Sequence, residues 1–260
     1  MFKILLSLDP FFLAICAGLF TFLLTALGSA VVFFFKNIND KVLVIMLGCS
    51  SGVMIAASFW SLLEPAIELN SSISNQTYLI PTIGFILGGI LIIVSDILFS
   101  KLTKNSTNQR NALIVASVSL HNLPEGLAIG VAFGALSLLT YNEGNVINAL
   151  LLAFGIGIQN LPEGSCISLP LKESNMSSFK SFLIGSLSGI LELIGVLLGF
   201  IFSNITTLLL PFLLSFSAGC MIAVSASELI PDAFSKNKTL ACIGLIFGFS
   251  LMMALDVGLS

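Results

Sequence analysis

Apolar residues gather into eight long runs along the chain, and short polar segments separate these runs. Each run is long enough to cross the roughly 30 Å hydrocarbon core of a bilayer as an α-helix. The pattern therefore predicts an all-α polytopic membrane protein, in which residues 1–260 form a single transmembrane domain. The eight predicted helices are 8–35, 42–69, 79–101, 111–139, 145–170, 180–203, 207–234 and 239–259.

Composition agrees with a membrane location and argues against one class of partner. The chain is 57% hydrophobic and 9% charged, whereas soluble domains carry roughly 25% charged residues. The net charge of −3 says little about partners, but the chain has no basic stripe or aromatic ladder, so nucleic acid is not expected as a partner. The five cysteines lie singly in apolar runs, without a CxxC pair, so we expect small core residues. Gly84 and Gly88 form a GxxxG packing signal, which need not mean dimerisation, so a homodimer stays open.

Basic residues orient the predicted helices, because lysine and arginine are retained on the cytoplasmic side of a membrane. The even-numbered connections, 70–78, 140–144 and 204–206, contain none. Nine of the ten basic residues lie in the odd-numbered connections: Lys36, Lys41, Lys101, Lys104, Arg110, Lys172, Lys180, Lys236 and Lys238. Both termini are therefore expected outside, with Lys3 as the one exception. A cleaved signal peptide is a weaker interpretation of the first run, which Asp9-Pro10 interrupts early.

Two polar hexapeptides interrupt the fourth and fifth apolar runs, HNLPEG at 121–126 and QNLPEG at 159–164. The helical rise places both near the bilayer centre. Consecutive spanning helices are antiparallel, so two copies at equal depth are expected to face one another across a local two-fold axis. Within each copy, residues four apart share a helix face. That spacing sets His121 beside Glu125 and Gln159 beside Glu163, with Asn122 and Asn160 flanking that face.

The sixth run adds Glu192 at a similar depth. A charge at the bilayer centre costs at least about 2.5–3.5 kcal/mol, and three glutamates would also repel one another. A shared divalent cation would offset both costs, and mixed N and O donors suit Zn²⁺, Fe²⁺, Mn²⁺ or Cd²⁺. Met54 is a further, soft candidate ligand. The predicted metal ligands are His121, Asn122, Glu125, Gln159, Asn160, Glu163, Glu192 and Met54.

Other acids lie at both ends of the predicted helices and outline a transport pathway. Attraction at one end, dehydration at the centre and release at the other would move a cation across. Asp9, Glu64, Glu68 and Asp256 lie toward the outer side, and Asp96, Glu228 and Asp232 toward the inner side. The pattern thus favours a secondary importer of divalent transition-metal cations, bound as cargo and not as a catalytic cofactor.

Several other functions stay open or are disfavoured. An intramembrane metalloprotease would need a second histidine, and the chain has one, so an enzyme is not expected. Direct ATP drive is not expected either, because no GxxxxGK[ST] loop is present. The main alternative is a proton-linked channel or transporter of a small polar solute, in which the glutamates relay protons without metal. In a purely structural subunit, the polar residues would only join helices by hydrogen bonds.

The motif pair resembles the ZIP (Zrt-, Irt-like protein) divalent-metal transporters, in particular their bacterial GufA-like branch. HNLPEG, the second xNxPEG, SGxxE in the sixth run and eight spans with outer termini carry this resemblance. SGVMIAASFWSLLEPAIE, SASELIPDAF and GFSLMMALD are also similar to that branch. The resemblance implies a 3+2+3 arrangement with two inverted three-helix repeats, a bacterial cytoplasmic (inner) membrane location, and uptake by an elevator-like, alternating-access movement.

The resemblance further implies a central binuclear site. One metal position would use His121, Glu125, Gln159, Glu163 and Met54. The neighbouring position would use Asn122, Glu125, Asn160, Glu163 and Glu192. Asp96 and Glu228 would belong to the exit route.

The chain departs from the family pattern at several positions. Many relatives carry histidine at the position of Gln159, and GufA-like relatives often carry aspartate at that of Asn160. The amide at residue 160 lowers the charge of the second metal position. Ser227 stands where relatives often have a second histidine, which weakens the exit site. The connection 101–110 lacks histidine, so metal sensing by this segment is not expected.

Overall fold

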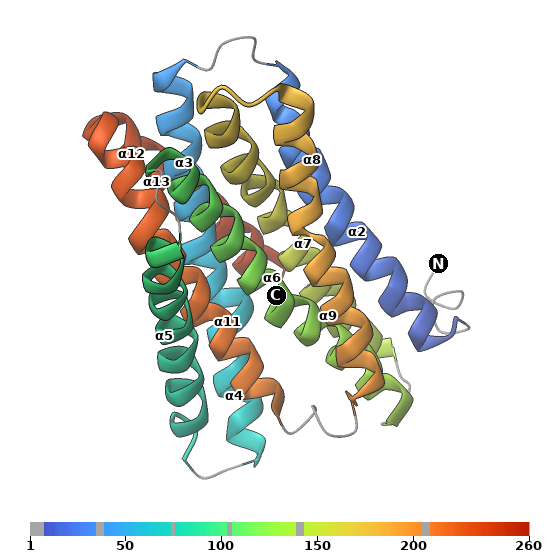
Figure 1. The fold of residues 1–260 in the computed structure, drawn as a ribbon. Helices are drawn as coiled ribbons and strands as arrows, with labels where there is room; N and C mark the ends of the chain where they lie inside the picture. The colour runs from blue at the N-terminus through green and yellow to red at the C-terminus, as the bar shows by residue number, and fades with distance from the viewer. Residues whose placement is uncertain are drawn as a thin grey trace.

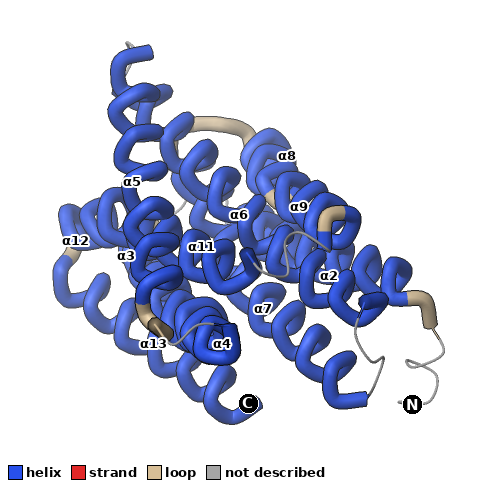
Figure 2. Tube along the Cα trace, turned by 90° about the horizontal axis from the view of Figure 1, so that it is seen from below, coloured by secondary structure: helices blue, strands red, loops and turns tan. Residues whose placement is uncertain are grey.

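A computed structural model describes residues 8–34, 39–73, 76–102, 106–138, 143–203 and 209–259. Within these ranges every regular element is helical and none is a strand (Figure 2). The elements are α2 (Pro10–Ala30), η1 (Val31–Phe34), α3 (Asp40–Ala57), η2 (Ser58–Leu63), α4 (Glu64–Ile73), α5 (Leu79–Leu102), α6 (Ser106–Leu138), α7 (Glu143–Glu173), α8 (Ser178–Ser188), α9 (Ile190–Ile201), α11 (Leu210–Val224), η4 (Ser225–Leu229), α12 (Ile230–Lys236) and α13 (Lys238–Leu259).

The described part of the chain forms eight helical rods, because several elements continue one another. Seven rods are long and apolar enough to cross a membrane, and the remaining rod, α6, has 33 residues and packs along α9. The predicted all-α polytopic architecture is therefore confirmed. Three of the expected helix ends, at 35, 139 and 207, lie outside the described residues, and so do Lys3, Lys36 and Lys104.

Local sequence signals account for several helix ends. Asp9 caps α2: its Oδ1 accepts a hydrogen bond from the Phe11 amide at 2.8 Å, and proline follows at the first helical position. Asp9, which was expected toward the outer side of a pathway, makes this capping contact. Asn39 and Ser177 cap α3 and α8 in the same way. Gly189 is the single residue between α8 and α9, and it lies three residues before Glu192.

Four close helix pairs organise the bundle, and they are related by an internal two-fold exchange. The most extensive contacts join α2 with α7, α6 with α9, α3 with α13 and α5 with α11. The exchange replaces α2 by α8–α9, α3–α4 by α11–α12, α5 by α13, and α6 by α7. It therefore converts the α2–α7 pair into the α9–α6 pair, and the α3–α13 pair into the α11–α5 pair. This arrangement is that of two inverted three-helix repeats around α6 and α7 (Figure 1).

The same contacts divide the rods into two groups. One group contains α2, α6, α7, α8 and α9, and the other contains α3, α4, α5, α11, α12 and α13. Each group has a buried apolar cluster: Ile129, Phe133 and Ile156 belong to that of the first, and Leu43, Leu47 and Leu214 to that of the second. The larger cluster also takes in Ile167 of α7, so the two groups meet along that helix.

Glycines allow the paired helices to approach to backbone contact. A Cβ atom on Gly126 would lie 1.9 Å from the carbonyl oxygen of Glu192, and one on Gly164 would lie 2.0 Å from that of Thr25. These two glycines end the two hexapeptide motifs. The final residue of each motif is therefore required for packing, and it fixes α6 against α9 and α7 against α2.

Among the described residues, an ion pair joins the two groups at one end of the bundle. Lys236, the last residue of α12, pairs through Nζ with Oε1 of Glu173, the last residue of α7, and both side chains are partly exposed. Lys172 donates to the hydroxyl of Ser178 close by. In Figure 1 this end lies at the top, with α12 and the start of α8, and α4 lies at the opposite end.

Candidate metal centre

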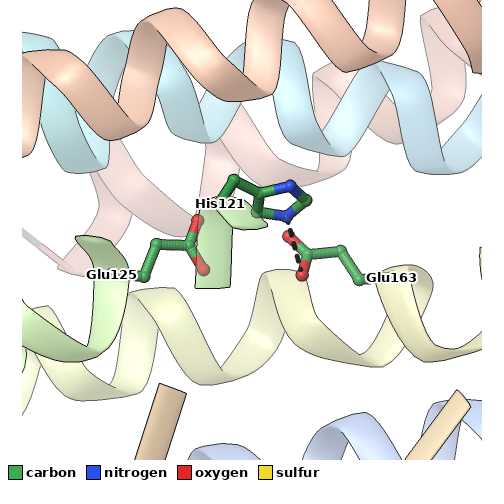
Figure 3. A group of neighbouring side chains, drawn as sticks. All are labelled: His121, Glu125 and Glu163. Carbon is green, nitrogen blue, oxygen red and sulfur yellow. Dashed lines mark ion pairs between the residues drawn. The ribbon is translucent and has the colours of Figure 1, made fainter. Parts of the chain in front are cut away.

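The centre of the bundle holds a compact group formed by His121, Glu125 and Glu163 (Figure 3). His121 and Glu125 lie one turn apart on α6, and Glu163 faces them from α7. All three side chains are 0% exposed. One ligand atom from each lies within 4.8 Å of the others, and His121 Nε2 is 3.4 Å from Glu163 Oε2. Imidazole and carboxylate donors at this spacing are typical of a transition-metal site.

Two amides hold the neighbouring carboxylates in place. Gln159 Nε2 donates to Glu125 Oε1 at 2.7 Å, and Asn160 Nδ2 donates to Glu192 Oε2 at 2.6 Å. Asn122 Nδ2 donates to the backbone oxygen of Ser188 at 3.3 Å. The seven polar residues predicted near the bilayer centre are thus all fully buried, and the contacts link them across α6, α7 and α9.

The carboxylates of this centre lack a full set of partners. Glu125, Glu163 and Glu192 lie close enough for their charges to repel one another. Among the ion pairs of the described residues, only that with His121 reaches any of them. Buried oxygens without a hydrogen-bond partner remain on each glutamate and on each of the three amides. Such an oxygen-rich, negatively charged pocket fits a divalent cation. The cation would neutralise the charge and be coordinated by the oxygens that lack a hydrogen-bond partner.

The two-fold exchange makes the two halves of the centre similar but unequal. Asn122 donates to Ser188 O, and Asn160 donates to the counterpart carbonyl, that of Thr21, at 3.4 Å. Thr25 occupies the position that corresponds to Glu192, because the backbone carbonyl oxygen of each is the atom nearest to where a Cβ on a motif glycine would lie. One half therefore has a carboxylate where the other has a hydroxyl. The contact of α2 with the centre was not expected, since Thr21 and Thr25 lie in an ordinary apolar run.

Two buried methionines lie on the other helix group, and one of them, Met221, contacts the centre. Met54 of α3 is 0% exposed, and its Sδ lies 3.8 Å from the hydroxyl of Ser225. Met221 of α11 is also 0% exposed, and its Sδ lies 3.9 Å from Gln159 Nε2. Only Met54 was expected here. The ligand role of Met54 stays a prediction, because its sulfur contact is with Ser225.

The outer acids line a cavity that leads toward the centre. A cavity of about 730 Å³ is bordered by Glu64, Glu68 and Asp256. Ser61 donates to Asp256 Oδ1 at 2.7 Å within this cavity. Its wall extends to Ile158, the residue before Gln159. The cavity is thus an acidic vestibule on the side of α4.

The acids predicted toward the inner side lie on three different elements. Asp96 is on α5, Glu228 on η4 and Asp232 on α12, and all three side chains are partly buried. Among the described residues, the group of three potential ligands at the centre includes none of them. Their part in a release route therefore stays a prediction.

Comparison with known proteins agrees with this architecture. A family model described as ZIP Zinc transporter matches residues 100–256. "Zinc transporter ZIP11" of Xenopus tropicalis is 34% identical, over 96% of this chain and 98% of that protein. "Zinc transporter ZIPB" of Bordetella bronchiseptica is 32% identical over 95% and 81%, and "Zinc transporter GufA" of Myxococcus xanthus is 31% identical over 90% and 94%. With the family model and relatives of nearly full length in agreement, the chain belongs to the ZIP family.

Proposed function

We propose that this protein is a secondary transporter that imports divalent transition-metal cations through the central site, with Zn²⁺ as the main cargo and Fe²⁺, Mn²⁺, Co²⁺ and Cd²⁺ as further candidates. The observation that carries the proposal is the fully buried group of His121, Glu125 and Glu163, in which two carboxylates with unpartnered buried oxygens lie beside an imidazole. The names of the relatives, all zinc transporters, support Zn²⁺ as the cargo.

The geometry supports a sequence of steps for the cation. The acids of the vestibule attract it, and Ser61 and Asp256 lie on its way to the centre. There His121, Glu125 and Glu163 replace its water, and the amide of Gln159 turns its oxygen toward it. Asn122, Asn160 and Glu192 offer a neighbouring position. The helix group that carries these ligands then slides past the other group, and release passes Asp96, Glu228 and Asp232.

The membrane orientation forms part of this proposal. Lys41, Lys172, Lys180, Lys236 and Lys238 begin or end helices on the side opposite the vestibule. Because basic residues are retained in the cytoplasm, this side is assigned to the cytoplasm and both termini to the outside. The protein would then lie in the bacterial cytoplasmic membrane, with its vestibule facing outward.

The direct test is uptake of Zn²⁺, Cd²⁺, Mn²⁺ and Fe²⁺ by proteoliposomes that contain the purified protein, beside protein-free liposomes. Uptake of at least one of these cations is expected, and the order of their rates gives the selectivity. The alternative is proton or polar-solute movement without metal. A folded protein that moves protons but none of these cations would favour this alternative and contradict metal import.

Acid is expected to slow transport. Lowering the outside pH from about 7.5 to about 5.5 should reduce Zn²⁺ uptake several-fold, because protons compete with the cation for His121 and the carboxylates. Initial rates of uptake into the same proteoliposomes provide the measurement. Zn²⁺ entry is followed with a metal-sensitive dye inside the liposomes, and ionophore-driven uptake at each pH corrects for the response of this dye. Equal corrected rates of Zn²⁺ uptake at the two pH values would contradict competition at these ligands.

Asn160→Asp is expected to make stability more dependent on metal. The new carboxylate would lie where the amide now donates to Glu192 at 2.6 Å, so it should repel Glu192 without metal and share a cation with metal. The unfolding temperature should fall by several degrees without metal, since about 1 kcal/mol corresponds to roughly 2–4 °C at this size. Zn²⁺ should raise it more than in the wild type.

Thermal unfolding in detergent, with and without Zn²⁺, makes this comparison. Asn148→Asp is the matched control, because Asn148 lies on the same helix but is exposed to the vestibule. An equal response to Zn²⁺ in wild type and Asn160→Asp would show that residue 160 does not face the cation.

A further inference from the structure

We propose that Met221 is a further, soft ligand of the transported cation and a determinant of selectivity, opposite Met54. The proposal rests on the metal-transport function above and names a residue that the motif reasoning did not reach. Three independent observations carry it: the contact of Met221 with Gln159, an internal sequence repeat, and the position of both methionines on the helix group that faces the central site.

The first observation is the position of the sulfur. Met221 Sδ lies 3.9 Å from Gln159 Nε2, and the same nitrogen donates to Glu125 Oε1 at 2.7 Å. One amide NH₂ group therefore lies between a carboxylate oxygen and a thioether sulfur, both of which offer lone pairs. In this arrangement the NH₂ group stands in for a cation. A metal ion that displaces it would meet the carboxylate and the sulfur together.

Gln159 itself can adapt to this exchange. Its Oε1 is buried without a hydrogen-bond partner, and rotation of the amide would exchange the positions of Oε1 and Nε2. The oxygen would then face the cation beside Glu125 and Met221. All three side chains are 0% exposed, so no solvent competes for these donors.

The second observation is an internal repeat in the sequence. Residues 50–58 read SSGVMIAAS and residues 217–225 read SAGCMIAVS, so serine, glycine, methionine, isoleucine, alanine and serine recur at equal spacing. The two segments lie on α3 and α11 and their π-helical continuations, which the two-fold exchange of the bundle relates. Met54 and Met221 are therefore counterparts. A residue that approaches the centre from one repeat has its partner in the other.

The third observation is the distribution of the candidate ligands between the two helix groups. His121, Glu125, Gln159 and Glu163 all lie on α6 and α7, in one helix group, whereas Met54 and Met221 lie on α3 and α11 in the other. The thioethers would thus bind the cation only while the two groups stand as in this structure. Because thioethers are soft and weak donors, they favour Cd²⁺ over Mn²⁺ and allow release when the groups slide.

Methionine also packs well in irregular cores, and a leucine substitution separates packing from ligation. Met and Leu are similar in volume, and this exchange usually costs less than about 1.5 kcal/mol in a core. Met221→Leu should therefore keep the fold and remove only the sulfur. Met46→Leu, two turns before Met54 on α3 and packed against the same apolar cluster, is the matched control.

The experiment measures Cd²⁺ and Mn²⁺ binding to the purified full chain in detergent by calorimetry, with X-ray absorption at the cadmium edge. For Met221→Leu we expect Cd²⁺ affinity to fall on the order of tenfold, Mn²⁺ affinity to change less than about twofold, and the cadmium–sulfur signal to shrink. Met46→Leu should match the wild type. Unchanged Cd²⁺ affinity and an unchanged sulfur signal in folded Met221→Leu would overturn the ligand role.

The outcomes separate this inference from the proposed function. If wild type binds and transports Cd²⁺ while Met221→Leu is equal to it in both assays, only the role of Met221 fails. If folded wild type binds neither cation, the metal-transport function itself fails. An equal loss of Cd²⁺ and Mn²⁺ binding would indicate that Met221 only positions Gln159, which also overturns ligation.

Discussion

Proteoliposomes that contain the Glu125→Ala/Glu163→Ala double variant are expected to take up Zn²⁺ no faster than protein-free liposomes. The two glutamates belong to both proposed metal positions, and their loss leaves His121 as the only member of the central group. Removal of a single outer-shell partner commonly costs 10- to 100-fold in metal affinity or activity, so loss of two direct ligands should cost more than about 100-fold.

The double variant should still fold. The two truncations leave a cavity, but they also remove two buried charges that repel each other. Its elution profile and unfolding temperature establish this before transport is measured. Asp40→Asn is the matched control, since Asp40 is an exposed acid in the first turn of α3. Wild-type rates of Zn²⁺ uptake by a folded double variant would contradict transport through this site.

Gly126→Ala is expected to lower the free energy of unfolding by at least about 3 kcal/mol, the upper part of the range for overpacked sites. The added Cβ would lie 1.9 Å from the carbonyl oxygen of Glu192. Backbone cannot yield as a flexible side chain can, so α6 and α9 must move apart. Because Glu192 is one of the proposed ligands, metal binding should weaken together with stability.

Gly89→Ala provides the control for this prediction. The nearest atom to a Cβ at residue 89 is 3.8 Å away, an ordinary contact, and alanine favours a helix over glycine by about 1 kcal/mol. Its unfolding temperature should therefore equal or slightly exceed that of the wild type. Equal unfolding temperatures for Gly126→Ala and Gly89→Ala in the same detergent would show that the close approach of α6 and α9 does not limit stability.

Sequence alone predicts the all-α membrane class because apolar runs of this length have few alternatives. It also brings the central residues together: Glu125 and Glu163 were expected to face each other, and in the structure both lie in one buried group with His121. Helical spacing was enough for this, because depth and face follow directly from residue number.

Other features depend on tertiary contacts that spacing does not report. The π-helical segments η2 and η4 are one such case, and the capping role of Asp9 is another. Met221 was missed because a methionine in an apolar run is indistinguishable from a core residue. The signal was present in the repeat SSGVMIAAS and SAGCMIAVS, which a comparison of the chain with itself would have found.

The ion pair between Lys236 and Glu173 has a consequence for the timing of transport. It links α12 to α7, and hence the two helix groups, at the end opposite the vestibule. A partly exposed pair of this kind contributes up to about 1 kcal/mol. If the two helix groups slide past one another as proposed, opening a path toward that end would first separate this pair, which would favour the conformation seen here by a factor of at most about five. Without bound cation, the protein would therefore mostly populate the conformation in which its vestibule is accessible to the next cation.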